Sequence, residues 1–210
     1  MTQLLLIRHG QSTWNAIGRL QGWADPPLDE IGREQARKLA RRLADEGHSL
    51  AAIYSSPLAR ARQTAEEIAR ALKLILQTDD RLKENNVGQL TGLTGPEIDE
   101  QFPEWVALFR RSGNEWVQPP GGEDRDEFVN RAVAAMSDIV AKHPEQTVAI
   151  ISHGGTLGVY LAHLLGMPIH RRLPFQFDNA SLSVVRVDNA QARVRLIKFN
   201  DTSHLMDGTQ

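Results

Sequence analysis

The segment LLLIRHGQSTWN, residues 4–15, runs from four apolar residues straight into an arginine and a histidine. A short, wholly apolar run that ends abruptly in charge is typical of a buried strand, which we expect over Leu4 to Ile7. Arg8, His9 and Gly10 then lie at the end of that strand. A cationic pair contributes little to a core at this position, whereas it is well suited to binding an anion.

A second segment, VAIISHGGTLG at residues 148–158, shows the same pattern of an apolar strand, a histidine and glycine. The strand is expected over Thr147 to Ile151, so that His153 and Gly154 follow its end. In an open α/β sheet, ligands bind outside the carboxyl ends of the strands. His9 and His153 are therefore predicted at one edge of the sheet, where a site would be built.

Strands and helices alternate along most of the chain, which favours a mainly parallel sheet with helices on both faces. A final hairpin is expected to add an antiparallel edge strand. The predicted fold class is therefore α/β, a three-layer αβα sandwich. The expected strands are 4–7, 51–54, 74–77, 147–151, 181–187 and 193–199, with a turn at Asp188-Asn189; the expected helices lie between Asp29 and Gly47, at 58–72, 97–101 and 104–111, from about Asp124 to before Pro144, and at 157–165.

The length of 210 residues suits a single domain spanning 1–210. A stretch rich in glycine and proline at about 85–122 is expected to be a helical and loop insertion that covers one end of the sheet, and so the active site. The last strand would leave an exposed edge, through which a homodimer could form.

Composition limits the classes of partner and compartment. The net charge of −2 gives no basic field for nucleic acid or anionic membranes, so any preference for anions must be local. No cysteine is present, which excludes disulfides, thiolate metal sites and a catalytic thiol. No apolar run is long enough for a signal peptide or a membrane span. We therefore expect a cytoplasmic protein that binds neither nucleic acid nor membranes.

Three other chemistries fit these histidines poorly. A metal site is disfavoured because no His-Glu-x-x-His motif occurs and Arg8 would repel a divalent ion beside His9. A serine triad is disfavoured because Ser152 and His153 are neighbours on an extended segment, so their side chains diverge. The glycines after His153 lack the spacing of a dinucleotide-binding fingerprint.

Phosphoryl transfer fits better, because it needs cations around the phosphate oxygens, an in-line nucleophile and a proton for the leaving oxygen. Arg8, His9, His153 and the turn glycines supply most of this set. In the segment SSPLARARQTAEEIA, residues 55–69, Arg60 lies in the first turn of a predicted helix and could grip the same anion with its planar fork. Arg62 is expected on the solvated face of that helix.

The ordered set of motifs resembles the histidine phosphatase superfamily, which has the phosphoglycerate mutase-like fold, and specifically its phosphatase branch. The motifs span nearly the whole chain: Arg8-His9-Gly10 with Asn15, SSPLARARQTA at 55–65, Glu84 in RLKENNVGQLTG, PPGGED at 119–124 and SHGG at 152–155.

The resemblance implies a role for each matching residue. His9 would be the nucleophile that becomes a phosphohistidine, and Glu84 the proton donor. Arg8, Arg60 and His153 would hold the phosphate. No metal or cofactor is expected. The remaining predicted phosphate-binding or substrate-binding residues are Gly10, Gln11, Asn15, Gln21, Gly22 and Gly154.

Two features bear on the choice between a phosphatase and a mutase. Val87 stands where mutases carry a tyrosine, whereas Arg110 and Arg111 could imitate the basic grip of mutases on a carboxylate. His204 in the tail could reach the rim of the pocket or be structural.

The leading hypothesis is a metal-independent phosphatase that hydrolyses small phosphorylated metabolites through a phosphohistidine on His9. The alternatives are a phosphoglycerate mutase and a non-catalytic phosphate-binding module.

Overall fold

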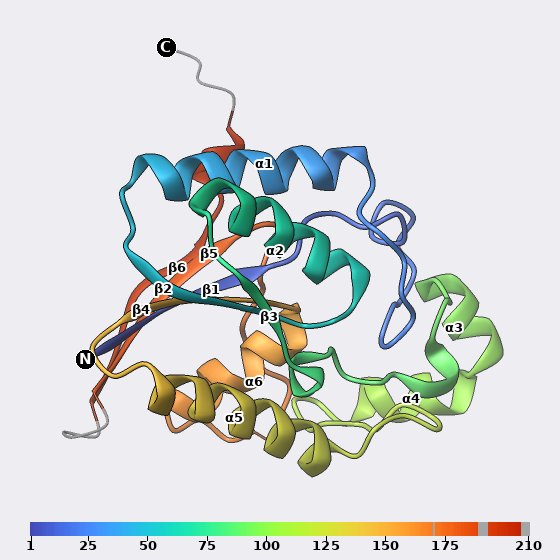
Figure 1. Cartoon of the computed structure of the whole chain (residues 1–210). Coiled ribbons are helices and arrows are strands. Elements are labelled where there is room, and N and C mark those ends of the chain that lie inside the picture. Colours follow the sequence, from blue (N-terminus) through green and yellow to red (C-terminus); the bar gives the residue numbers. More distant parts are fainter. Residues whose placement is uncertain (170, 189–192, 207–210) are drawn as a thin grey trace.

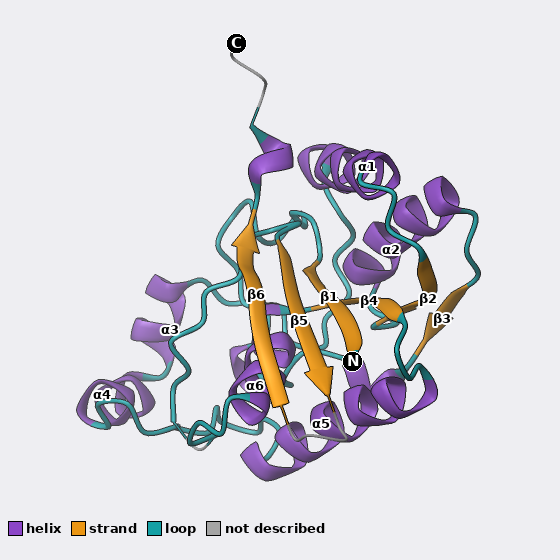
Figure 2. Ribbon diagram, turned by 90° about the vertical axis from the view of Figure 1, so that its left-hand side faces the viewer, coloured by secondary structure: helices purple, strands orange, loops and turns teal. Residues whose placement is uncertain are grey.

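The computed structural model describes residues 1–169, 171–188 and 193–206. Within these residues, six strands form one sheet in the order β3-β2-β4-β1-β5-β6, and helices cover both of its faces (Figures 1 and 2). The strands are β1 (Thr2–Arg8), β2 (Leu50–Ser55), β3 (Leu76–Thr78), β4 (Thr147–Ser152), β5 (Leu182–Asp188) and β6 (Arg193–Asp201). Strands β1 to β4 are parallel to one another, whereas β5 runs antiparallel to both β1 and β6. This confirms the predicted α/β class and the antiparallel edge.

Each face of the sheet has its own helical layer. Alternation along β1 sends Leu5 and Ile7 into the core beneath α1 and α2, and Leu4 and Leu6 into the core beneath α5 and α6. The helices are α1 (Glu30–Asp45), α2 (Ala59–Leu72), α3 (Gly95–Gln101), α4 (Pro103–Arg111), α5 (Arg125–Lys142) and α6 (Gly154–Leu164), with single 3₁₀ turns η1 (Asp80–Leu82), η2 (Gly88–Leu90) and η3 (Ser203–Leu205).

Most element boundaries differ from the expected ones by only a few residues. Helix α3 begins at Gly95 rather than Glu97, because the Thr94 side chain and the Glu97 carboxylate form a reciprocal capping box. The short strand β3 begins two residues after the expected start at Leu74. The predicted turn at Asp188-Asn189 lies partly outside the described residues.

Strand pairing explains why the two histidines meet. Strands β1 and β4 are adjacent and parallel, with Arg8 opposite Ser152. The backbone N–H of His9 donates to the Ser152 carbonyl at 3.0 Å, which places His9 and His153 side by side beyond the sheet edge.

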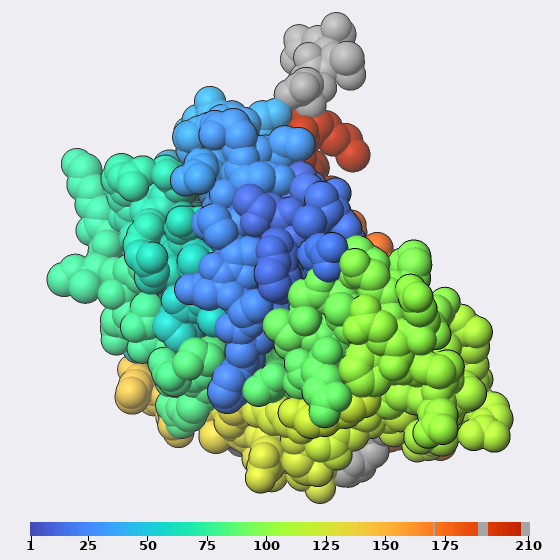
Figure 3. Space-filling view, turned by 90° about the vertical axis from the view of Figure 1, so that its right-hand side faces the viewer, coloured from blue at the N-terminus to red at the C-terminus, as the bar shows by residue number. Residues whose placement is uncertain are grey.

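The segment 85–122 carries α3 and α4 and lies at the edge of the molecule toward which β1 runs (Figure 1). From that side, it adjoins the loop that follows β1 (Figure 3). Its ends are joined at Gly88, which has φ +55° and whose missing Cβ would lie 2.3 Å from the Pro120 carbonyl oxygen. Only glycine fits this crossing.

Strand β6 forms one edge of the sheet and exposes Leu196, Ile197 and Phe199. Pairing of two copies through this edge stays a prediction. None of the helices in the described ranges combines the length and the apolar character needed to cross a lipid bilayer.

Candidate active site

A cavity of about 600 Å³ opens beyond the carboxyl ends of β1 and β4. It is lined by most of the predicted site residues, namely Arg8, His9, Asn15, Gln21, Gly22, Arg60, Glu84 and Gly154. His153 is buried directly beside His9, with their ring centroids 5.2 Å apart. The structure therefore brings together groups that are separated by up to 146 positions in the sequence, from Arg8 to Gly154.

His9 has the geometry of a nucleophile. Its side chain is 3% exposed, and Nδ1 lies 2.7 Å from the carbonyl oxygen of Gly10. That contact fixes the proton on Nδ1 and leaves the lone pair of Nε2 available. Burial, reinforced by the nearby Arg60 and Arg8 cations, holds the pKa of His9 well below its usual range. The imidazole is therefore neutral at physiological pH.

Arg8 and Arg60 place two guanidinium groups at the cavity. Arg60 is 1% exposed, and its two terminal nitrogens donate to the Ala24 and Gly22 carbonyls, each at 2.9 Å. Arg8 donates to the Phe177 carbonyl. Neither guanidinium forms an ion pair with a carboxylate of the described residues, and burial lowers the pKa of Arg60 to about 10. Both side chains are thus cations at neutral pH that lack a bound counter-charge.

One ring nitrogen of His153 is hydrogen-bonded, and the other has no partner among the described residues. Its Nε2 lies 2.8 Å from the Ser56 hydroxyl, whose oxygen also accepts the Leu58 backbone N–H. With the Ser56 hydroxyl donating to Nε2, the proton of neutral His153 resides on Nδ1. That nitrogen is buried and has no hydrogen-bond partner in the described ranges. It can therefore donate to a phosphate oxygen.

Glu84 reaches the cavity from the loop between η1 and η2. Its Oε1 accepts the backbone N–H of Asn85 at 2.8 Å, and its Oε2 accepts that of Gly155 at 2.9 Å. A Cβ on Gly155 would lie 2.4 Å from Oε1, so the carboxylate occupies the space that a side chain would take. Glu84 thus lines the cavity, and its role as proton donor stays a prediction.

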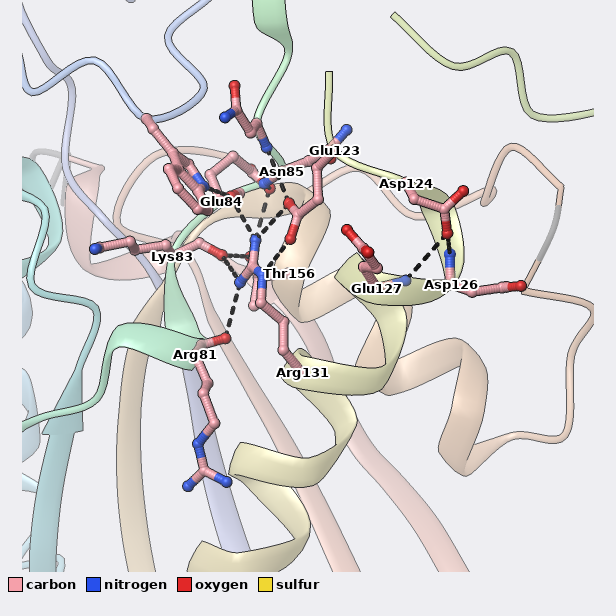
Figure 4. A network of polar contacts seen from close by, with 12 residues as sticks. Arg81, Lys83, Glu84, Asn85, Glu123, Asp124, Asp126, Glu127, Arg131 and Thr156 are labelled. Atoms are coloured by element: carbon pink, nitrogen blue, oxygen red, sulfur yellow. Dashed lines mark hydrogen bonds and ion pairs between the residues drawn. The ribbon is translucent and has the colours of Figure 1, made fainter. Parts of the chain in front are cut away.

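The loop that carries Glu84 is held by Arg131 of α5, which sequence reasoning missed. Figure 4 shows its guanidinium reaching across to the carbonyls of Arg81, Lys83 and Glu84, at 2.9, 2.6 and 2.8 Å. It also pairs with Glu123 through two nitrogens, at 2.5 and 2.8 Å. A sequence signal was present, because Arg131 adjoins Ala132 on the buried stripe of α5.

Three predicted residues do not line the cavity: His153, which is buried beside His9, and Gly10 and Gln11. The backbone N–H of Gly10 donates to the Thr64 hydroxyl at 3.0 Å. Gln11 directs its amide to the carboxylate of Asp29, the N-cap of α1, at 2.8 Å. Gly10 and Gln11 are therefore engaged with other parts of the chain.

Asn15 and Gln21 are oriented by Ser12. The Asn15 side-chain oxygen accepts the Ser12 backbone N–H at 3.1 Å, and the Gln21 oxygen accepts the Ser12 hydroxyl at 2.8 Å. Both oxygens are thus occupied, and the two amide NH₂ groups have no partner within the described part of the chain. They are donors available to a ligand.

Three further candidate residues from the sequence lie outside the cavity. Arg110 is exposed and pairs with Asp99 at 3.1 Å, and Arg111 is also exposed. His204 packs near α1, with its Nδ1 3.3 Å from a terminal nitrogen of Arg42, so it is a structural residue.

Comparison with known proteins places this geometry in a family. Phosphoserine phosphatase 1 of Hydrogenobacter thermophilus is 38% identical over 98% of this chain and 95% of its own length. A Yersinia pestis protein named as a phosphoglycerate mutase is also 38% identical, over 90% of this chain and 85% of its own.

Comparison with solved structures gives matches over nearly the whole chain as well. The YhfR protein of Bacillus stearothermophilus matches with a TM-score of 0.87 and 33% identity, covering 98% of this chain and all of its own. Phosphoserine phosphatase of Entamoeba histolytica, solved with 3-phosphoglyceric acid, matches with a TM-score of 0.84 and 27% identity, covering 98% and 100%. The sequence signature of the histidine phosphatase superfamily, branch 1, matches residues 4–201. The predicted resemblance is confirmed: the chain belongs to the histidine phosphatase superfamily.

Proposed function

We propose that this chain is a metal-independent phosphomonoesterase that hydrolyses small phosphorylated metabolites through a phosphohistidine on His9. One observation carries the proposal: Nε2 of a buried, neutral His9 faces a cavity where Arg8 and Arg60 have no carboxylate partner among the described residues. These cations would neutralise the equatorial phosphate oxygens while Nε2 attacks in line. The relatives named as phosphatases support the same activity.

The reaction proceeds in two balanced steps. Nε2 of His9 forms a bond to phosphorus while the ester P–O bond breaks, and the leaving oxygen takes a proton from Glu84. The Glu84 carboxylate then accepts a proton from water, whose oxygen attacks phosphorus and breaks the N–P bond to release inorganic phosphate. Such acid–base assistance contributes about 10²–10⁴-fold to the rate.

One feature favours water over a second substrate hydroxyl as the acceptor. Val87, which lines the cavity, has no hydroxyl where mutases carry a tyrosine. Arg110, a candidate mutase-like residue, pairs with Asp99 at the surface and does not line the cavity. Hydrolysis is therefore preferred to mutase activity. Phosphate release measured against interconversion of 2- and 3-phosphoglycerate decides between the two.

The test is to trap the covalent intermediate. With a phosphomonoester labelled in phosphorus, the Glu84→Gln protein should accumulate an acid-labile, base-stable phosphoenzyme and turn over about 10²–10⁴-fold more slowly. The His9→Ala protein should form no phosphoenzyme and have no activity. EDTA should not inhibit the unaltered protein.

Surface replacements of the same residue types serve as controls. His163→Ala on α6 and Glu100→Gln on α3 alter exposed side chains and should keep full activity. A fully active His9→Ala protein would refute the assignment. Tight phosphate binding without turnover across a broad panel of phosphomonoesters would instead point to a non-catalytic phosphate-binding module.

A further inference from the structure

The cavity has a second cationic end, formed by two arginines that the reaction does not use. Arg125, the first residue of α5, is 8% exposed and donates through Nε to the Ile169 carbonyl at 2.8 Å. Its guanidinium lies 4.3 Å from the centre of the Trp116 ring. Arg172 lies similarly over Phe109, at 3.6 Å, and both guanidiniums line the cavity. Aromatic stacking thus fixes the orientation of both side chains.

Neither of these cations is paired. Within the described ranges, neither Arg125 nor Arg172 forms an ion pair with a carboxylate, and Nε of Arg172 is buried without a hydrogen-bond partner. The neighbouring cavity residue Arg19 differs, because it pairs with Glu97 at 2.9 Å. Burial lowers the pKa of Arg125 to about 10, so it remains charged at neutral pH.

The charges around the cavity are strongly unequal. Among its described lining residues, five are arginines and Glu84 is the only acid. A phosphate group at Arg8 and Arg60 would compensate the charge at one end and leave Arg125 and Arg172 without a counter-ion. Because a cation without a counter-ion is costly when it is buried, as Arg125 is, or partly buried, as Arg172 is, the charge distribution favours a ligand with a second negative group.

Part of the cavity lining is apolar. Phe128, Val159 and Leu173 belong to it and offer no charged group to a ligand. A cavity of about 600 Å³ is also much larger than a phosphate group needs. The space between the cationic ends therefore suits an uncharged body that connects two anions.

We propose that Arg125 and Arg172 form a carboxylate subsite, and that the preferred substrates are phosphomonoesters that bear a carboxylate at the end remote from the phosphate. This inference rests on the proposed phosphatase function and assigns its substrate class. Guanidinium groups suit the role, because their planar fork of N–H donors matches the geometry of a carboxylate.

The experiment compares pairs of esters that differ in the carboxylate. One pair is 3-phosphoglycerate and glycerol 3-phosphate, in which the phosphate leaves from the same type of primary hydroxyl. The other pair is 4-carboxyphenyl phosphate and phenyl phosphate. In this pair an aromatic ring holds the carboxylate farther from the phosphate. In at least one pair, kcat/KM should be about 10- to 100-fold higher for the carboxylate ester, the range expected for charged hydrogen bonds. The Arg125→Leu protein should lose this preference while its kcat/KM for the ester that lacks the carboxylate changes less than about 3-fold.

Two further variants separate specificity from folding. Arg172→Leu alters a less deeply buried side chain and should also reduce the preference, which provides an independent test if Arg125→Leu folds poorly. Arg110→Leu removes an exposed arginine and should retain the full preference.

The outcomes that contradict the inference are distinct from those that contradict the function. Hydrolysis of all four esters without a carboxylate preference, or equal losses on both members of a pair in the variants, would overturn the subsite and leave the phosphatase intact. A protein that hydrolyses none of them would contradict the proposed function, and this inference with it.

Discussion

At the scale of single residues, His9 shows how neighbouring groups set the chemistry of a side chain. One ring nitrogen is hydrogen-bonded to the Gly10 carbonyl, and burial, reinforced by two guanidinium groups, keeps the ring neutral. The sequence pointed to His9, Arg8 and Arg60 because each follows or adjoins the end of an apolar strand. It could not show that the Gln11 amide turns to Asp29, since neighbouring residues on an irregular segment can point in any direction.

Gly155 provides a residue-scale test of Glu84. In Gly155→Ala, the new methyl group would lie 2.4 Å from Oε1 of Glu84, and the flexible carboxylate must move. We expect kcat to fall by about 10- to 100-fold, part of the contribution of general acid catalysis, with little change in melting temperature.

Gly95→Ala is the matched control for this prediction, because a Cβ at that position meets no atom within 4 Å. Steady-state kinetics and thermal melts on both proteins check it. Unchanged kcat in Gly155→Ala would show that the observed place of the carboxylate is unimportant for turnover.

At the scale of secondary-structure elements, the alternation of strands and helices predicted the fold class. Local sequence patterns could not predict which residues hold the Glu84 loop in place. Arg131 acts on carbonyls 47 to 50 positions away in the sequence, and contacts of this separation are determined by tertiary packing. Strand β3 was displaced for a similar reason, because its start depends on pairing with β2.

The network around Arg131 makes an element-scale prediction. Arg131→Met removes the donors that bind the carbonyls of Arg81, Lys83 and Glu84 to α5, so Glu84 should lose its position. We expect kcat to fall by about 10-fold or more with a smaller change in KM, because Arg131 does not line the cavity.

Arg131→Lys, which keeps a cation but has no planar fork, should recover only part of the activity. The phosphoenzyme should still form on His9 in both variants and should break down more slowly. If kcat and the rate of phosphoenzyme formation fell by the same factor, the variants would be generally misfolded.

At the scale of the whole molecule, one sheet edge gathers buried cations and neutral histidines from segments that are far apart in the sequence. The alternation of elements predicted a mainly parallel sheet, yet the order β3-β2-β4-β1-β5-β6 requires long-range pairing that no local signal encodes. The direction of Arg125 and Arg172 into the cavity likewise depended on the packing of α5 against the chain that follows α6.

The buried histidines make stability depend on pH. His9 and His153 have folded-state pKa values well below 6.5, chiefly because of burial, whereas the unfolded chain binds protons near 6.5. The unfolded state therefore binds more protons below that pH, and the free energy of unfolding should decrease as pH falls through 6.5. Each histidine contributes up to about 1.4 kcal/mol per pH unit.

Urea unfolding between pH 7.5 and 5 checks this expectation. The slope should be smaller for His153→Gln, whereas His163→Gln, at an exposed position, should leave it unchanged. A slope unaffected by His153→Gln would mean that this histidine can bind a proton in the folded state.

The buried guanidiniums also bear on how hydrolysis ends. In the proposed reaction, Arg8 and Arg60, which line the cavity, bind the phosphoryl group, and that group is still present, with its full charge, in the inorganic phosphate left after the phosphohistidine is cleaved. Departure of this product separates an anion from two desolvated cations, so free phosphate competes with incoming ester. Product inhibition is thus inherent in this architecture, and the turnover rate becomes sensitive to the phosphate concentration around the enzyme.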